Sequence, residues 1–401
     1  MVPASGQLQK SPPRDVAPVV PPGAPAEAGA VTRLVGEVVY MYAFDVAYEM
    51  SRHPVRELLG QPVAQFVVDA TKRSPRQLFF YRPQMVRLPA VEKPGPLGPV
   101  RMERTVKLLP LGAISITVRV PFAVERIEQL VAFHDLKFRD GSWLYDDVRE
   151  LAERVRKELE PFYVRPVEHL GDEEAYTVFC VNSPLLAADG SRVRVEDWMK
   201  RSRREIAALL TEEPDPQHLS EQEASESSER YFSYYEDDVV VIDWDAALVV
   251  DHPRNFDEIL YIMELANVQL AELEAYDRIL DEALERAYRD LSFGGKRWRG
   301  QRTSAVQREL REIRIDLARM SDELSNITKF FGDWHLARIY QGLSARFHLS
   351  DWHRTIDEKL KTLGDLYQFL QADQMNRWMI TLEAMIVLLF VLDIVKSVFG
   401  K

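Results

Sequence analysis

The sequence has a single cysteine, Cys180, among its 401 residues. One cysteine forms no internal disulfide and no cysteine-based zinc cage, and it suits a reducing compartment. The chain also lacks a positive charge balance, because its formal net charge at pH 7 is −12. This excludes binding to nucleic acid over the whole surface, so any such contact must involve a local basic patch.

Motifs for common enzyme chemistry are absent too. The sequence contains no GxGxxG, no P-loop, no nucleophile elbow and no zinc-ligand spacing. We therefore predict a protein without catalytic residues, cofactor or metal.

One group of potential metal ligands has a simpler interpretation. The triplet Asp-Trp-His occurs at 333–335 and again at 351–353, with His348 between them. These side chains could ligate a metal. However, Ser350 or Asp351 also suits a helix N-cap, and the two tryptophans suit a corner between helices, which is the interpretation we favour.

Two regions differ in composition before residue 253. The segment 1–31 lacks the apolar core of a secretory signal and is rich in proline and alanine, which predicts a disordered tail. The segment 32–252 mixes strand and helix signals without a regular βαβ rhythm, which predicts an α+β domain. Within it we expect an acidic, serine-rich loop at 212–230. Asp243 and Asp245 are expected to flank a hairpin turn, although paired carboxylates also occur in metal and acid–base sites.

Heptad repeats replace the strand signals after this domain. They cover 259–291, 306–331 and 356–370, and only Asp277 interrupts the first of them with a polar residue. Apolar residues in steps of four and three predict long helices packed side by side. We predict a stalk of three helices over 253–376, formed within one chain or between the chains of a homo-oligomer.

The third heptad helix continues into the most hydrophobic part of the chain, because no glycine or proline interrupts residues 365–399. The segment from Trp378 to Phe399 would form about 33 Å of helix, and the hydrocarbon core of a bilayer is about 30 Å thick. We therefore predict one transmembrane helix at 377–401; the alternative is a soluble core or assembly helix. The residues that define the predicted anchor are Trp378, Glu383, Leu388, Phe390, Asp393 and Lys396.

The same segment predicts a location. The large N-terminal part has no export signal, so it should stay in the cytoplasm while the C-terminal helix crosses the bilayer once. The abundance of arginine and alanine and the absence of a transit peptide indicate a bacterial chain. The expected location is therefore the bacterial inner membrane.

A basic segment between the first two heptad helices indicates a partner class. Its defining residues are Lys296, Arg297, Trp298, Arg299 and Arg302. Cations around an aromatic ring suit RNA phosphates and bases or the headgroups of anionic lipids. The alternative is a solvated connection between two helices.

The C-terminal part of the chain, which contains the predicted stalk and anchor, resembles the DUF155 (Rmd1-like) family in the order of its features. The family has an aromatic-acidic turn, a helix bearing a tyrosine, a heptad helix, and a membrane segment that opens with Leu-Glu and contains a later acid. The matching positions are Trp334, Tyr340, Leu360–Leu370, Leu382–Glu383 and Asp393. The sequence departs from the family in its second helix, where Asp357 and Lys359 replace arginine and asparagine. The resemblance implies a membrane-anchored protein that is not an enzyme.

We therefore expect an α+β domain on a helical stalk that acts as a membrane-anchored scaffold or tether. A divergent CorA-type channel or transporter subunit for divalent cations is the alternative, because those proteins also join a cytosolic α/β domain to a long helix. The Gly-Met-Asn signature and the second span of such channels are missing here.

Overall fold

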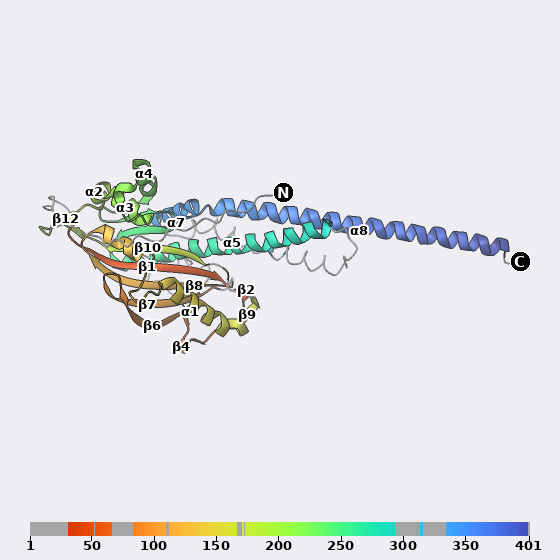
Figure 1. Ribbon diagram of the computed structural model, residues 1–401, viewed down its shortest axis with the longest axis horizontal. Coiled ribbons are helices and arrows are strands. Elements are labelled where there is room, and N and C mark those ends of the chain that lie inside the picture. The colour runs from red at the N-terminus through yellow and green to blue at the C-terminus, as the bar shows by residue number, and fades with distance from the viewer. Residues whose placement is uncertain are drawn as a thin grey trace, which may run out of the picture.

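The computed structural model places an α+β head at one end of a long pair of helices (Figure 1). It describes residues 31–399 except for 52, 66–82, 110–111, 167–170, 172, 293–310, 312 and 316–333. The basic segment at 296–302 and most of the second heptad helix lie outside the described residues.

A nine-stranded sheet forms the head. In spatial order its strands are β13 (Tyr231–Phe232), β14 (Val239–Ile242), β15 (Ala246–Asp251), β10 (Glu174–Asn182), β1 (Leu34–Asp45), β8 (Ala113–Val124), β7 (Gly98–Leu108), β6 (Gln84–Gly95) and β5 (Ala64–Gln65). All neighbours are antiparallel except β10 and β15, which are parallel. Short two-stranded sheets flank it: β2 (Ala47–Met50) with β9 (Tyr163–Pro166), β3 (Glu57–Leu58) with β4 (Gln61–Pro62), and β11 (Leu185–Leu186) with β12 (Arg192–Val193).

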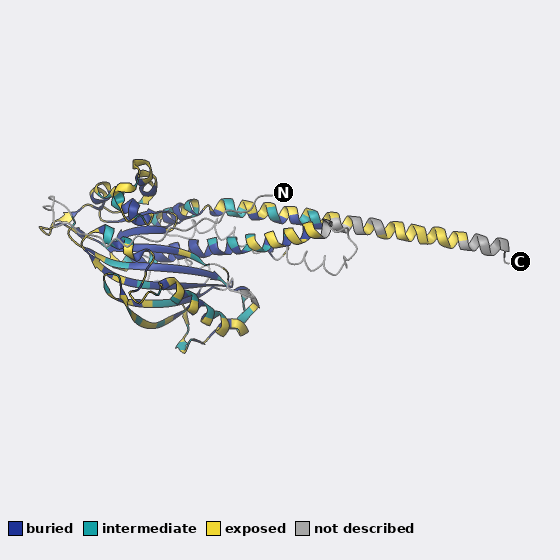
Figure 2. Ribbon diagram, viewed as in Figure 1, coloured by how far each residue is buried: buried dark blue, intermediate teal, exposed yellow. Residues whose placement is uncertain are grey.

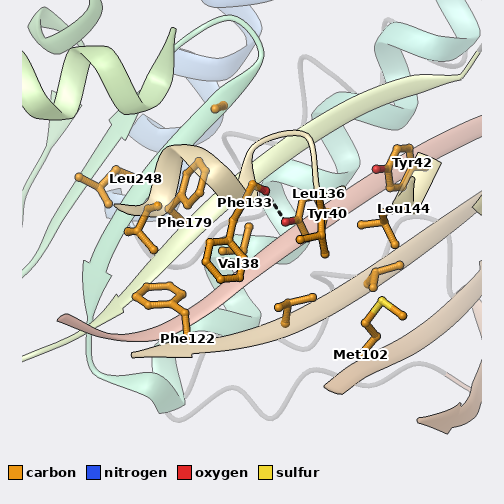
Figure 3. Close-up of a cluster of buried hydrophobic side chains, with 14 of the residues drawn as sticks. Val38, Tyr40, Tyr42, Met102, Phe122, Phe133, Leu136, Leu144, Phe179 and Leu248 are labelled. Carbon is orange, nitrogen blue, oxygen red and sulfur yellow. Dashed lines mark hydrogen bonds between the residues drawn. The ribbon is translucent and has the colours of Figure 1, made fainter. Parts of the chain in front are cut away.

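One face of the sheet packs on the short helices of the head. These are α1 (Leu144–Leu159), α2 (Val195–Arg201), α3 (Arg203–Leu210) and α4 (Glu221–Glu229), with short 3-10 helices at 127–133, 160–162 and 216–218; a further 3-10 helix, at 253–255, leads into α5. Alternate residues of β1 point into this core, because successive side chains of a strand face opposite sides. Val38 and Tyr40 lie there among Phe122 and Phe179, and the Tyr40 hydroxyl donates a hydrogen bond to the Phe133 carbonyl (Figure 3).

The other face packs on α5 (Phe256–Ser292), α7 (Trp334–Arg346) and α8 (Leu349–Phe399). Val39, Met41 and Ala43, the other alternate residues of β1, lie in this second core. Helices α5 and α8 run side by side away from the head, and α8 continues far past the end of α5 (Figure 1). In Figure 2 its outer part is exposed on every described residue.

The predicted transmembrane helix is wrong on this structure. Among the described residues, no helix is both long enough and apolar enough to cross a bilayer. This finding overturns the anchor predicted at 377–401 and, with it, the single-pass inner-membrane location.

Two local expectations have different outcomes. The hairpin predicted near Asp243 and Asp245 is confirmed, because β14 and β15 pair with Ile242 opposite Ala247. The acidic segment 212–230 is not simply a loop, since it contains α4. Ser220 caps that helix by accepting a hydrogen bond from the Glu223 backbone N–H at 3.0 Å, which is why a serine-rich stretch begins a helix here.

Candidate functional site

The candidate site is the helical stalk formed by α5, α7 and α8, because its outer end has a run of exposed apolar side chains. Two buried side-chain amides on α5 fix the start of this stalk. Asn267 donates from Nδ2 to the Glu174 carbonyl of β10 at 2.9 Å, and Gln269 accepts a 2.6 Å hydrogen bond from the Tyr340 hydroxyl of α7. These bonds set the rotation of α5 on the sheet and the position of α7 on α5.

Helix α8 packs on α5 through a heptad seam with one charged position. Ile356, Leu360 and Leu363 are at most 1% exposed. Between them, Lys359 places its Nζ 2.6 Å from a carboxylate oxygen of Asp277 and 2.6 Å from one of Asp281. Burial lowers the pKa of Lys359, but the hydrogen bonds and charges of the two carboxylates outweigh it and raise the pKa overall.

The corner between α7 and α8 fits against the β14–β15 hairpin. Arg346 pairs with Asp243, and the rings of Phe347 and Tyr176 meet edge to face with their centres 5.1 Å apart. His348 has a positive φ of 51°, which turns the chain from one helix into the next. The aspartate of the hairpin thus serves to hold the stalk.

Asp333 of the first Asp-Trp-His triplet lies outside the described residues. Among the residues that the structure describes, no group of three or more His, Cys, Asp or Glu side chains could hold a metal ion. His348 and Asp351 form a local pair at 3.0 Å, which lowers the pKa of the Asp351 carboxyl. Helix α8 begins at Leu349, just before the expected cap residues Ser350 and Asp351.

A cluster of acids lies where α5 leaves the sheet. Burial raises the pKa of Glu174, and a hydrogen bond with the Glu274 carboxyl raises it further. Burial also raises the pKa of Asp45 to about 6, against the opposing charge of Arg278. Both carboxyls therefore favour their protonated forms more in the folded protein than in the unfolded chain.

The outer part of α8 has a long run of exposed apolar side chains. We call the residues Trp378–Val391 the apolar end. All fourteen are exposed, and the large apolar side chains among them are between 45% and 68% exposed. They point to every side of the helix, whereas a helix that packs on a single neighbour has a single apolar stripe.

The predicted anchor residues map onto this end. Trp378, Glu383, Leu388 and Phe390 are exposed within it. Asp393 and Lys396 continue the same helix, and their side chains lie outside the described residues. The predicted polyanion-binding residues Lys296, Arg297, Trp298, Arg299 and Arg302 also lie outside them, so that interpretation stays a prediction.

Sequence reasoning missed the polar positions of the stalk. The heptad repeat predicts which apolar residues of α5 and α8 meet, but it does not predict Gln269 or the partner of Lys359. One signal was present: Asp277 breaks the apolar repeat of α5, and an unpaired charge at such a seam would be costly. A basic residue on the facing helix was therefore to be expected.

Comparisons with known proteins match the head. Residues 35–257 match the family described as "Uncharacterized protein MJ0711, N-terminal domain". The relative of that name from Methanocaldococcus jannaschii is 23% identical over 227 residues, which are 56% of this chain and 66% of the relative. No solved structure matches. These matches do not show the DUF155 assignment suggested by the C-terminal part of the chain.

Proposed function

The chain belongs to the family described as "Uncharacterized protein MJ0711, N-terminal domain", and we propose that it is a scaffold that self-associates through the apolar end of α8. In this proposal the head presents binding surfaces and the stalk sets the distance between heads. No catalytic step is part of the proposal.

The observation that carries the proposal is the exposed surface of Trp378–Val391. Eleven large apolar side chains, each roughly half to two-thirds exposed, present on the order of 1,000 Å², and a stable protein interface needs about 800 Å² per partner. Exposed apolar patches of this size mark interaction sites on proteins in water.

A second copy of this chain is the partner that fits the surface. A helix that is apolar on every side needs several neighbours of similar length, and identical helices supply them. Leu388 and Val391 also continue, by whole heptads, the seam in which Tyr367 and Leu363 pack on α5. Parallel copies would place their heads together at one end, where α5 already occupies one side of each α8.

The DUF155 resemblance supports a scaffold but contributes no residue-level contact to this proposal. The alternative of a CorA-type cation channel has no specific support in the described residues, since no cluster of metal-ligating side chains occurs among them. It stays a prediction from the sequence.

The proposal predicts that the full chain is an oligomer and that removing the outer part of α8 gives a monomer. Sedimentation velocity from about 1 to 50 μM should give a multiple of the 46.3 kDa chain mass for the parent. The chain that ends at Gln374 should sediment as a monomer. Its far-UV circular dichroism spectrum should show that the head and the rest of the stalk keep their fold.

Paired substitutions separate a specific bundle from nonspecific clustering. Leu388→Gln with Val391→Gln removes two residues on the seam side, and Ile386→Gln with Phe390→Gln removes two on the opposite side. A bundle in register loses affinity more strongly with the first pair. A monomeric parent, or equal loss with both pairs, would contradict self-association through this seam.

A further inference from the structure

A groove lies beside α5, on the part of the sheet that no other described helix covers. It has a volume of about 470 Å³ and lies between β6, β7 and β8 on one side and the first turns of α5 on the other. Helix α5 covers β1 and β10, and no other described helix covers the polar face of β6 and β7 beside it. Leu260 and Tyr261 of α5 form an apolar wall of the groove.

The strand register brings cations around one threonine. Arg87 of β6 lies directly opposite Thr105 of β7, and Thr105 lies directly opposite Thr117 of β8. Lys107 is two residues from Thr105 on the same face of β7. Arg119 of β8 pairs with Glu103, so it is the diagonal neighbour of Thr105. Opposed residues in a sheet are about 5 Å apart at Cβ and diagonal ones about 7–8 Å, so Arg87 can reach a group bound over Thr105. Lys107 and Arg119, which are held in ion pairs, add positive charge beside it.

The groove has more positive than negative groups, although the chain as a whole has a net charge of −12. Its cations are Arg87, Arg101, Arg104, Lys107 and Arg119, and its carboxylates are Glu103, Asp257 and Glu264. Lys107 pairs with Glu264, and Arg119 pairs with Asp257 and, at 3.5 Å, with Glu37. Neither Arg87 nor Arg101 has an ion pair among the described residues, and both are exposed toward solvent.

We propose that this groove binds a small anion that carries two linked phosphate groups. One phosphate would lie over Thr105, where Arg87 offers a guanidinium and the threonine a hydroxyl donor. Arg101 lies four residues away on the same face of β7, about 13 Å along the strand, and its long side chain reaches back to the second phosphate. Tyr261 and Leu260 would cover the remainder of the ligand.

Phosphate fits this arrangement better than a single carboxylate. The Arg87 guanidinium and the Thr105 hydroxyl lie on neighbouring strands, with the ion-paired Lys107 and Arg119 beside them. This arrangement suits a tetrahedral group with more than one charge and several acceptor oxygens. A long nucleic acid does not fit, because the positive surface is confined to a short groove on an acidic molecule. The anion therefore belongs to the class of small diphosphate compounds.

Calorimetric titration of the full chain with pyrophosphate, at low ionic strength, tests the proposal. Arg87→Gln and Arg101→Gln should each weaken binding about tenfold, because each removes a charge-assisted hydrogen bond. Both side chains are exposed, so the variants should keep the far-UV spectrum and unfolding midpoint of the parent. The matched control is Arg203→Gln, an exposed arginine of α3 that lies outside the groove, and it should leave binding unchanged.

Two further probes decide the class of ligand. Inorganic phosphate should bind more weakly than pyrophosphate because it engages only the Thr105 end of the groove. Citrate, which carries charge without phosphate, should bind more weakly still. Absence of pyrophosphate binding, equal binding by the parent and the Arg87→Gln variant, or citrate binding as tight as pyrophosphate binding would each overturn the proposal. None of these results depends on self-association of the stalk.

Discussion

A buried ion pair joins the sheet to α5. Lys107 and Glu264 are 9% and 5% exposed, and the Glu264 carboxylate also accepts a 2.6 Å hydrogen bond from the Ser115 hydroxyl. Removing one partner leaves a charge in the protein interior without compensation. We expect Glu264→Ala to lower the free energy of unfolding by about 3 kcal/mol in urea denaturation.

The matched control replaces both charges. Lys107→Met combined with Glu264→Leu keeps the volume and leaves no unpaired charge, so its stability should stay within about 1 kcal/mol of the parent. If this double variant loses as much stability as Glu264→Ala, the pair itself, and not the orphaned charge, provides the stabilisation.

The acids at the base of α5 predict a dependence of stability on pH. Burial raises the pKa of Asp45 to about 6, and burial together with the Glu274 carboxyl raises that of Glu174. The folded state therefore holds protons that the unfolded chain has released above about pH 4. The contribution of these two carboxyls to the free energy of unfolding is full below that pH. It is lost as the pH rises through their pKa values in the folded protein.

The urea midpoint of the parent should consequently fall between pH 5 and pH 8, apart from the contributions of other groups. Glu174→Gln keeps a neutral, hydrogen-bonding side chain at every pH, so it should reduce this fall and stabilise the protein at pH 8. The exposed Glu150→Gln serves as the control, with the pH dependence of the parent. If the urea midpoint of Glu174→Gln falls with pH as steeply as that of the parent, Glu174 is ionised in the folded protein.

Between the two stalk helices, Lys359 determines how α8 aligns with α5. Asp277 and Asp281 are one helical turn apart on α5, and without the ammonium group they would repel each other. A charged position in a heptad seam also favours a single alignment of the helices, because a shifted alignment leaves the charges unpaired.

Lys359→Met should therefore destabilise the stalk by about 1 kcal/mol, a modest effect because the pair is partly exposed and screened by solvent. The difference from the parent, measured as a melting midpoint by circular dichroism, should shrink at 1 M salt. Lys361→Met, an exposed neighbour on α8, should melt like the parent. Equal shifts of the melting midpoint in the two variants would show that Lys359 acts only by adding a positive charge, and not by pairing with Asp277 and Asp281.

The elements differ in how far the sequence predicts them. The alternation of Ile114, Ile116, Val118 and Val120 predicts β8, and the heptads predict α5 and α8, because a single apolar period dominates each segment. Helix α4 was missed, since its composition is that of a loop and its start depends on one cap at Ser220. The hydropathy of the outer part of α8 predicts a membrane span, because hydropathy alone does not distinguish a lipid partner from a protein partner of the same apolar surface.

The whole molecule contains features that no local pattern encodes. The strand order places β10 between β1 and β15, and it thereby decides which polar residues face the groove and which acids meet at the base of α5. Residues such as Arg87 and Thr105 have no motif in the sequence; only the register that pairs them makes a binding site.

The central position of β1 has a consequence for how the chain is made. Its neighbour β8 pairs Phe122 with Gly36, but its other neighbour, β10, pairs the much later Val181 with the same glycine. At about 5–20 residues per second, a ribosome takes roughly 7–30 seconds to synthesise the chain from Gly36 to Val181. During this time β1 has a partner on at most one side, and its free edge can pair with the wrong strand. The middle of the finished sheet is thus translated well before β10 and must wait for that strand before both its edges are closed.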